Sequence, residues 1–292
     1  MQFAIAKKCY KLDLALLTCL KISIKNNFIT INLKVTTLNQ FNYFCIMAWF
    51  ETWFDTPYYH LLYKNRDFAE AETFISLLVK YLEIPKSSKI IDLACGKGRH
   101  SVFLNQLGYS VLGLDLSKES ILHNKNFEND TLKFAVHDMR NEIFPEISEE
   151  KVDAVFNLFT SFGYFENEND DKKVFQSVKN SLAENGFFVL DFLNEKWVKN
   201  TLVPESTIVK ENIEFNIKKR IENGHIIKDI QFEDQGKDFH FFEKVKLHTL
   251  ENIEKYAEDF GFERVKIFGD YLLKDFDEET SPRCINVLKR VK

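Results

Sequence analysis

The sequence predicts an α/β fold in which helices cover both faces of a mainly parallel sheet. The first observation is an apolar run at residues 90–94, which suits a buried strand. Gly96 and Gly98 end this run, and a helix-like segment comes next. The second observation is a pair of further apolar runs, at residues 110–115 and 132–136, which predict two more strands. A strand, a glycine turn and a helix form the first half of a nucleotide-binding unit.

Acidic residues stand at or near the ends of these predicted strands. Asp92 lies within the first strand, where a buried carboxylate is costly without a partner. Asp115 ends the second strand about twenty residues after the first glycine, a position from which an acid binds the hydroxyls of a ribose. His137 and Asp138 come directly after the third strand. Because the carboxyl ends of parallel strands meet at one edge of a sheet, we expect these side chains to converge on one crevice.

Three short motifs carry a resemblance to a known family. They are DLACGKGRHS at residues 92–101, LDLS at 114–117 and HDMR at 137–140. These stretches resemble the first three motifs of class I S-adenosylmethionine-dependent methyltransferases, and the likeness runs from about Trp49 to the C-terminus. The chain looks most similar to small-molecule methyltransferases, including N-methyltransferases that act on amino sugars. The resemblance implies a Rossmann-like seven-stranded sheet, an antiparallel last strand between its neighbours, and S-adenosylmethionine as the cofactor.

The resemblance also implies which residues bind the cofactor. In similar enzymes a tyrosine of the first helix reaches the cofactor carboxylate, and Tyr63, with Tyr59 as the alternative, matches that position. The implied cofactor-binding residues are Tyr63, Arg66, Asp92, Ala94, Cys95, Gly96, Gly98, Asp115, Leu116, Asp138, Met139, Asn157 and Leu158. Ser161 would lie near the sulfonium, and the acceptor-side candidates are Phe162, Tyr164 and His240. No general base is assigned, because a sulfonium methyl is already activated and a lone histidine such as His100 is more often structural.

The remaining elements of the domain are predicted from periodicity. The aromatic-rich segment at 49–63 predicts one helix, and apolar residues at helical spacing predict a second helix at 68–82, which Pro85 ends. Further elements are a strand at 151–158, a helix at 170–182, a strand at 187–192, a helix at 250–260, and strands at 263–269 and 281–289. Asp191 and Asn194, at the end of the fifth strand, are expected to face the same crevice.

Residues 206–248 show a different pattern, in which apolar and polar residues alternate. Such alternation is typical of an antiparallel sheet with one wet face, and Asn223-Gly224 predicts a two-residue hairpin turn. We interpret the segment as an antiparallel β insert that forms a lid over the cleft. Its rings at Phe239, Phe241 and Phe242 need a covered face. The alternatives are a structural addition or a dimer surface, which would make the protein a homodimer.

Composition limits the function classes. The net charge of −5 over 292 residues argues against a broad basic face for nucleic acid. The five cysteines, at positions 9, 19, 45, 95 and 284, show no metal-binding spacing, so neither a zinc site nor a disulfide framework is expected. A reducing cytoplasm fits this usage best. The partner that we expect is a small-molecule acceptor, with no metal and no membrane.

The first 46 residues differ from the rest. They hold six lysines and one acid, Asp13, and so carry +5, which leaves −10 for residues 47–292. No apolar run is long enough to span a bilayer. We expect residues 1–46 to be a poorly ordered extension outside the fold and residues 47–292 to form the domain. A transit peptide is the functional alternative for the extension.

Two other functions compete with methyl transfer. An NAD(P)-dependent oxidoreductase shares the strand, glycine turn, helix and acid, but Ser101 stands where its third glycine would be. A non-catalytic cofactor-binding protein would keep the cofactor motifs without using the acceptor pocket. The intact motif set favours an enzyme that methylates a nitrogen or an oxygen of a small molecule.

Overall fold

The computed structural model describes residues 21–25, 28–32, 49–64 and 68–291. By its internal contacts the chain divides into two units, Met1–Ile46 and Met47–Lys292. In the first unit, strands β1 (Lys21–Lys25) and β2 (Phe28–Asn32) pair antiparallel. All other described elements belong to the second unit.

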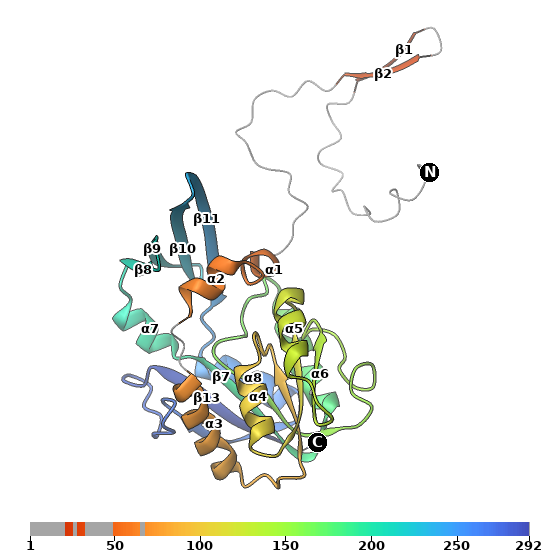
Figure 1. The fold of residues 1–292 in the computed structure, drawn as a ribbon, viewed down its shortest axis with the longest axis vertical. Coiled ribbons are helices and arrows are strands. Elements are labelled where there is room, and N and C mark those ends of the chain that lie inside the picture. Colours follow the sequence, from red (N-terminus) through yellow and green to blue (C-terminus); the bar gives the residue numbers. More distant parts are fainter. Residues whose placement is uncertain (1–20, 26–27, 33–48, 65–67, 292) are drawn as a thin grey trace. The chain divides into compact units, whose positions relative to one another are not determined.

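A seven-stranded sheet with the order β12-β13-β7-β6-β3-β4-β5 forms the centre of the second unit (Figure 1). Its strands are β3 (Lys89–Leu93), β4 (Ser110–Asp115), β5 (Leu132–Val136), β6 (Val152–Asn157), β7 (Leu182–Leu193), β12 (Phe262–Phe268) and β13 (Arg283–Arg290). Strands β3 to β7 pair in parallel, whereas β13 is antiparallel to both of its neighbours. The predicted fold class is confirmed, including the reversed last strand.

Helices cover both faces of this sheet. They are α3 (Phe68–Leu82), α4 (Arg99–Gln106), α5 (Lys118–Asn124), the 3-10 turn η2 (Lys125–Phe127), α6 (Glu168–Ser181), α7 (Glu195–Thr201) and α8 (Leu250–Asp259). Ile90 of β3 belongs to the core that holds Phe74 of α3, and its neighbour Ile91 belongs to the opposite core with Phe175 of α6 and Ile253 of α8. Strands buried on both faces must be apolar throughout, as β3 is. In the part of the chain that the structure describes, no helix is long and apolar enough to cross a membrane.

The insert is a separate four-stranded antiparallel sheet, as the alternation predicts. Its strands are β8 (Glu205–Lys210), β9 (Ile213–Glu222), β10 (His225–Asp234) and β11 (Lys237–Lys246), in the order β11-β10-β9-β8. The turn between β9 and β10 is Asn223-Gly224, where both residues have positive φ values of 48° and 72°. Two consecutive left-handed residues match the twist of a two-residue hairpin, which explains why this dipeptide forms the turn.

The aromatic segment before α3 forms two short helices, α1 (Trp49–Trp53) and α2 (Pro57–Leu62), so the prediction of one helix is wrong. Thr56 interrupts it, because its side chain accepts a hydrogen bond from Tyr59 N at 3.1 Å and caps α2, with Pro57 at the first helical position. Both helices lie between the insert and the large sheet (Figure 1). Trp53 and Leu62 share a buried cluster with the apolar face of the insert.

Candidate active site

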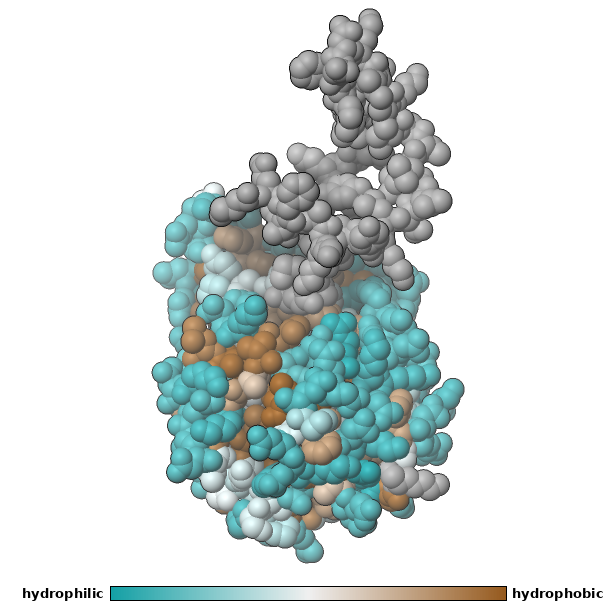
Figure 2. Space-filling model, turned by 90° about the vertical axis from the view of Figure 1, so that its right-hand side faces the viewer, coloured by the Kyte–Doolittle hydropathy of each residue, from teal (hydrophilic) through white to brown (hydrophobic). Residues whose placement is uncertain are grey.

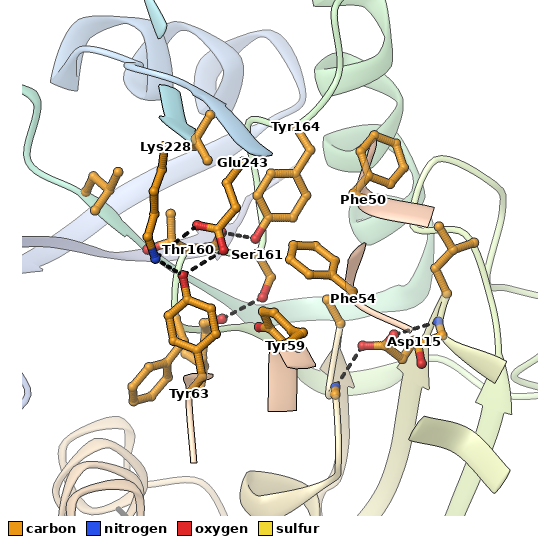
Figure 3. Close-up of a pocket in the computed structure, with 18 of the residues that line it drawn as sticks. Phe50, Phe54, Tyr59, Tyr63, Asp115, Thr160, Ser161, Tyr164, Lys228 and Glu243 are labelled. Carbon is orange, nitrogen blue, oxygen red and sulfur yellow. Dashed lines mark hydrogen bonds and ion pairs between the residues drawn. The ribbon is translucent and has the colours of Figure 1, made fainter. Parts of the chain in front are cut away.

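A cavity of about 710 Å³ opens at the carboxyl ends of β3, β4, β5 and β6 (Figure 3). One wall consists of the loops after these strands, with lining residues at 94–97, 115–117, 137–139 and 158–161. The other wall comes from α1, α2, α7 and the insert. The volume lies in the range of small-molecule and cofactor sites. Figure 2 shows one face of the molecule, where hydrophilic residues surround an area of apolar residues.

The glycine loop between β3 and α4 borders the cavity through Gly96. Its φ is +53°, and a Cβ added there would meet no atom within 4 Å, so the backbone at Gly96 is open to an approaching ligand. Gly98 differs, because a Cβ there would lie 3.0 Å from the ring of Phe134. Gly98 caps α4 with a left-handed φ and is not among the residues that line the cavity. Its predicted cofactor contact is therefore corrected to a packing role.

Asp115 ends β4 with its carboxylate in the cavity wall (Figure 3). Gly96 N donates to Oδ2 at 2.7 Å and Ser117 N donates to Oδ1 at 2.8 Å. Burial raises the pKa of this carboxyl, and hydrogen bonds from the backbone at Ser117, Gly96 and Leu116 oppose the rise. Each oxygen keeps a second acceptor position, so the carboxylate can bind two further donors from a ligand.

Asp92 and Asn157 lie behind the loop and do not line the cavity, contrary to the prediction for both. Asp92 is buried and accepts a hydrogen bond from Ser101 Oγ at 2.5 Å, while burial raises its pKa to about 6. Asn157 Nδ2 donates to Leu93 O at 3.1 Å and to Ser161 O at 3.3 Å. Both side chains therefore stabilise the loops through hydrogen bonds, and other residues line the cavity where a ligand would bind.

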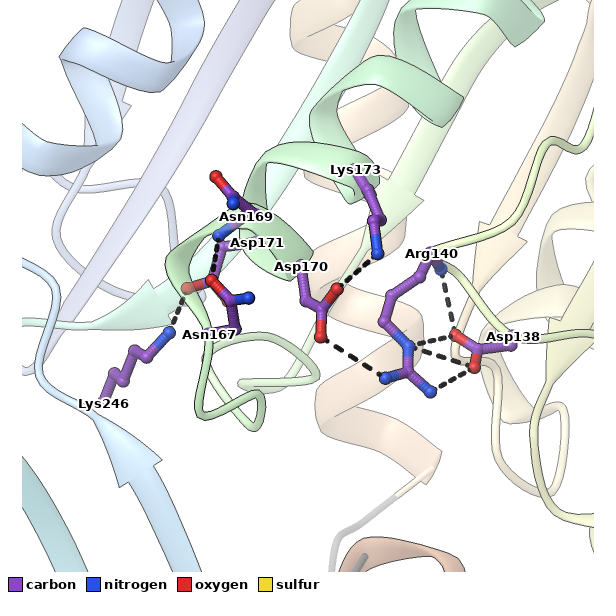
Figure 4. A network of polar contacts seen from close by, with 8 residues as sticks. All are labelled: Asp138, Arg140, Asn167, Asn169, Asp170, Asp171, Lys173 and Lys246. Carbon is purple, nitrogen blue, oxygen red and sulfur yellow. Dashed lines mark hydrogen bonds and ion pairs between the residues drawn. The ribbon is translucent and has the colours of Figure 1, made fainter. Parts of the chain in front are cut away.

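Asp138 lines the cavity at the end of β5, and Arg140 holds its carboxylate (Figure 4). The Nε of Arg140 lies 3.0 Å from both carboxylate oxygens, and one terminal nitrogen lies 2.5 Å from Oδ2. Burial opposes the negative charge, but the hydrogen bonds from Arg140 outweigh it and hold the pKa of Asp138 below its ordinary value. The carboxylate therefore stays charged, with part of its acceptor capacity in use.

The loop after β6 is strained where it borders the cavity. Phe159 and Thr160 have φ values of 59° and 65°, in the left-handed region that disfavours side chains. Phe159 N donates to Asp191 Oδ2 at 2.7 Å, and Arg283 donates to Asp191 Oδ1 at 2.6 and 2.8 Å. Asp191 is fully buried, and through these hydrogen bonds it holds the loop in place. The prediction that Asp191 faces the crevice is therefore wrong.

Asn194 is likewise turned away from the cavity, where it was expected. Its Nδ2 donates to Glu278 O and Ser281 O, both at 2.8 Å, and its Oδ1 accepts from Lys196 N to cap α7. The residue therefore joins the segment before β13 to the start of α7, which is a structural role.

The three acceptor-side candidates separate in the structure. Tyr164 lines the cavity, and its hydroxyl donates to Thr160 O at 2.5 Å. Phe162 is fully buried among Phe175 and Phe192 and does not reach the cavity. His240 lies on the outer face of the insert, 57% exposed. The predictions for Phe162 and His240 are therefore wrong. Their places in the sequence suggested the cleft, but the ring of Phe162 lies in the core and that of His240 lies in solvent.

Aromatic rings form the wall between the loops and the insert. The ring of Tyr164 lies 5.3 Å from that of Trp49 and 5.4 Å from that of Phe54, and it stacks with Phe50 at 6.0 Å. The rings contact one another at angles and distances that are typical of favourable aromatic pairs. This wall is mostly apolar, as a site that must exclude water requires.

A cluster of polar side chains from α2 and the insert completes the cavity, and most of these residues were not predicted from the sequence. Tyr63 donates a hydrogen bond to Glu243 Oε1 at 2.6 Å, and Trp53 Nε1 donates to the same oxygen at 2.9 Å. Lys228 Nζ donates to Tyr63 Oη and lies 3.7 Å from Glu243 Oε2. Figure 3 shows Tyr63, Lys228 and Glu243 pointing toward one another at one end of the cavity. Arg66 lies outside the described residues.

Histidines in the cavity wall are neutral at pH 7. Burial lowers the pKa of His60 to about 4, holds that of His100 well below its ordinary value, and lowers that of His137. None of the three therefore places a positive charge in the site. Among the described residues, no three histidine, cysteine or acidic side chains are grouped in a way that would bind a metal ion.

Most of the predicted cofactor residues line this one cavity. They are Tyr63, Ala94, Cys95, Gly96, Asp115, Leu116, Asp138, Met139 and Leu158, together with Ser161 and the alternative Tyr59. Lining residues that the sequence did not single out as site residues include His60, Trp197, Lys219, Lys228 and Glu243. The one signal in the sequence for the last three was the alternation of the insert, which does not say which face is inside.

This arrangement defines a Rossmann-like domain that binds a nucleotide-type cofactor at the carboxyl edge of its parallel strands. The reversed β13 between β7 and β12 separates it from the dinucleotide-binding fold, whose two halves are parallel throughout. A family described as a methyltransferase domain matches residues 63–267. The chain belongs to that family of methyltransferase domains.

Individual proteins agree with this assignment. The glycine/sarcosine N-methyltransferase of Aphanothece halophytica is 32% identical over 133 residues, which cover 44% of this chain and 48% of that protein. The dTDP-3-amino-3,4,6-trideoxy-alpha-D-glucopyranose N,N-dimethyltransferase of Streptomyces venezuelae is 25% identical over 69% of this chain and 86% of its own. The chain thus spans about half the length of the first relative and most of the second.

The fold has a close counterpart among solved structures. An S-adenosylmethionine-dependent methyltransferase from Clostridium acetobutylicum superposes with a TM-score of 0.68 and 22% sequence identity. The match covers 80% of this chain and 96% of that one. At this identity the likeness shows the shared fold.

The cavity fits S-adenosylmethionine on its own geometry. The Asp115 carboxylate keeps two acceptor positions for ribose hydroxyls, and the open backbone at Gly96 leaves room beside it. Leu116 and Met139 add apolar lining at the ends of β4 and β5.

Proposed function

We propose that this enzyme transfers the methyl group of S-adenosylmethionine to a nitrogen atom of a small polar molecule. The observation that carries the proposal is the position of Glu243. Of the described residues with which the insert lines the cavity, Glu243 is the one carboxylate, and it lies at the end of the cavity away from Asp115 (Figure 3). A carboxylate there provides a partner for an amine. The name of the Streptomyces venezuelae relative, a sugar N,N-dimethyltransferase, supports nitrogen as the acceptor atom.

The same proposal assigns the cofactor contacts. Asp115 would hold the ribose, Leu116 and Met139 would border the adenine, and Gly96 would allow the cofactor to approach the backbone. Tyr63, at the other end of the cavity, would border the methionine portion while its hydroxyl stays bonded to Glu243 and Lys228. These roles are supported by the presence of all five residues in the lining of one cavity.

In this reaction the protein has to orient the acceptor more than it has to activate either reactant. S-adenosylmethionine supplies a methyl group that its sulfonium already activates. The acceptor must be held in line with that methyl group while water is excluded, and the ring wall of Trp49, Phe54 and Tyr164 serves this purpose. Electron-rich ring faces also attract positive charge. Glu243 would orient the amine through a hydrogen bond to its N–H.

An assay of paired acceptors tests the proposal. The purified protein and S-adenosylmethionine are incubated with small amines and with the matching alcohols, and mass spectrometry records the gain of one methyl group. We expect the amines to be methylated in preference to the alcohols. Glu243→Gln should reduce kcat/KM by roughly 10–150-fold, because a charge-assisted hydrogen bond contributes about 1.5–3 kcal/mol.

The matched control is Glu233→Gln, which changes an exposed residue of the same sheet in β10. It should leave kcat/KM unchanged. Preferential methylation of alcohols would rule out the nitrogen assignment, and full activity of the Glu243→Gln variant on amines would rule out the role of Glu243 in it.

We propose that residues 47–292 are sufficient for this function. The proposal is supported by their internal contacts, which form one compact unit. A chain that starts at Met47 should therefore fold and bind S-adenosylmethionine within a factor of about two of the full chain, as measured by calorimetry. A tenfold loss of affinity, about 1.4 kcal/mol, would show that the first 46 residues contribute to the site.

A reducing compartment such as the cytoplasm is part of the same proposal. Cys95 and Cys284, the two cysteines in the described residues, are buried free thiols. Burial raises the pKa of both, so each remains a protonated thiol rather than a reactive thiolate. Such thiols persist where disulfides do not form.

A further inference from the structure

Three charged side chains form one row across the cavity face of the insert. The strand register places Lys219 of β9 opposite Lys228 of β10, and Lys228 opposite Glu243 of β11. All three line the cavity. They continue the face that carries Phe215, Ile217, Ile230 and Phe241, because side chains two residues apart in a strand point to the same side. We call Lys219, Lys228 and Glu243 the charged row.

The charge along this row is not balanced. Lys228 and Glu243 compensate each other through their 3.7 Å contact and through Tyr63, which bonds to both. Lys219 makes no ion pair with any described residue. Its neighbour Lys218 points to the opposite face and lies 3.6 Å from Glu205. The row therefore carries one uncompensated positive charge, at the end away from Glu243.

Two lysines directly opposite each other on paired strands repel, which costs free energy in the unliganded protein. The side chain of Lys228 is only 15% exposed, so water screens this repulsion less than it would at the surface. An anion bound between the two ammonium groups would remove the repulsion and gain two charge-assisted hydrogen bonds.

The surroundings of Lys219 suit a ligand that extends from the reaction centre. Trp197, Val198 and Thr201 of α7 also line the cavity and carry no charge, and Lys219 N donates to Pro204 O, three residues after α7, at 2.6 Å. Glu243, Ser161 and Tyr164 lie at the other end of the row, beside the cofactor loops (Figure 3). A ligand whose anionic group meets Lys219 can therefore place its reacting atom near Glu243.

We propose that Lys219 and Lys228 form an anion-binding subsite for the acceptor, so that the substrate carries a carboxylate or a phosphate in addition to the atom that is methylated. The inference rests on the proposed methyl transfer to a small molecule, and it narrows that substrate to an anionic or zwitterionic class. Glu243 and Tyr63 hold the Lys228 ammonium in position for this contact.

The test uses simple anions as probes. Acetate, inorganic phosphate and pyrophosphate are titrated into the full chain by calorimetry at low ionic strength, with and without S-adenosylmethionine. We expect the wild type to bind at least one probe, and Lys219→Met to weaken that binding at least tenfold. Lys218→Met is the matched control on the outer face, and it should change nothing. Preference for acetate identifies a carboxylate acceptor, and preference for either phosphate probe identifies a phosphorylated one.

A second titration separates this subsite from the cofactor site. Lys219→Met should bind S-adenosylmethionine as the wild type does. If this variant instead lost cofactor and anion affinity in the same proportion, the charged row would serve the cofactor carboxylate and the proposal would be wrong. Failure of the wild type to bind any probe, or equal binding by Lys219→Met, would also overturn it. Because the anion titrations do not require turnover, their outcome is independent of the acceptor atom.

Discussion

Replacing Asp115 with alanine is expected to weaken S-adenosylmethionine binding by about 2–3 kcal/mol, roughly 30–150-fold. The carboxylate already accepts one backbone hydrogen bond on each oxygen and keeps one acceptor position on each for a ribose hydroxyl. Alanine removes both charge-assisted contacts to the cofactor. It also leaves Gly96 N and Ser117 N without their acceptor, so the glycine loop is less well held. Isothermal calorimetry measures the loss directly.

Two comparisons make the Asp115 result specific. Asp130→Ala changes an exposed acid in the turn before β5 and should not alter the affinity. Asp138→Ala should cost less than Asp115→Ala, because Arg140 already occupies part of the Asp138 carboxylate. Thermal unfolding of each variant checks that the protein remains folded. Unchanged cofactor affinity in folded Asp115→Ala would remove this residue from the site.

The parts of the site that the sequence predicted are those that local chain geometry determines. Gly96 lies just beyond one short buried strand and Asp115 ends the next, and parallel strands bring the residues at their carboxyl ends to one edge of the sheet. Their mutual hydrogen bond arises because β3 and β4 are neighbours in the sheet. The pattern of strand, turn and acid is therefore enough to predict both the fold and the cofactor side of the cavity.

The errors come from partners that are distant in the sequence. Asp191 has the same strand-end position as Asp115, yet Arg283, 92 residues later, binds its carboxylate and turns it away from the cavity. Phe162 comes after a strand as the lining residues do, but the loop directs it into the core beside Phe175. Periodicity describes one element at a time, so it cannot show which of several acids meets a buried cation.

The acceptor side illustrates the same limit for the insert. Alternation predicted an antiparallel sheet, and the register of that sheet decides which residues meet the cavity. Lys228 and Glu243 share a face with the aromatic residues that pack on α1 and α2, whereas His240 lies on the outer face with Asp229. A shift of one residue in register would exchange these sets. Alternation alone determines neither the register nor the covered face.

Replacing Lys246 with methionine is expected to destabilise the protein by about 3–5 kcal/mol at pH 8. Lys246 Nζ lies 2.5 Å from Oδ2 of Asp171, whose side chain is fully buried at the start of α6 (Figure 4). The nearby His248 gives no compensating charge, because burial lowers its pKa to about 4. Burial raises the pKa of Asp171 to about 6 even with Lys246 in place. Without the ammonium, the pKa must rise further.

The raised pKa of Asp171 determines whether the destabilisation by Lys246→Met grows or shrinks as the pH rises. A carboxyl whose pKa is higher in the folded than in the unfolded state binds its proton more tightly when folded, so it favours folding at low pH. The advantage is lost as the pH rises through the folded pKa, at about 1.4 kcal/mol per unit. The destabilisation of Lys246→Met should therefore be largest at pH 8 and should shrink toward about 1 kcal/mol at pH 5, where Asp171 is protonated. Urea unfolding at both pH values measures it.

Two variants isolate the buried charge as the cause. Lys244→Met removes a lysine of the same strand whose partner, Glu166, is 72% exposed, and it should cost less than about 1 kcal/mol at either pH. Adding Asp171→Asn to Lys246→Met removes the stranded carboxylate and should recover most of the loss at pH 8. A loss that is equal at pH 5 and pH 8, or that Asp171→Asn does not relieve, would mean that Lys246 stabilises the protein through the packing of its carbon chain rather than through its charge.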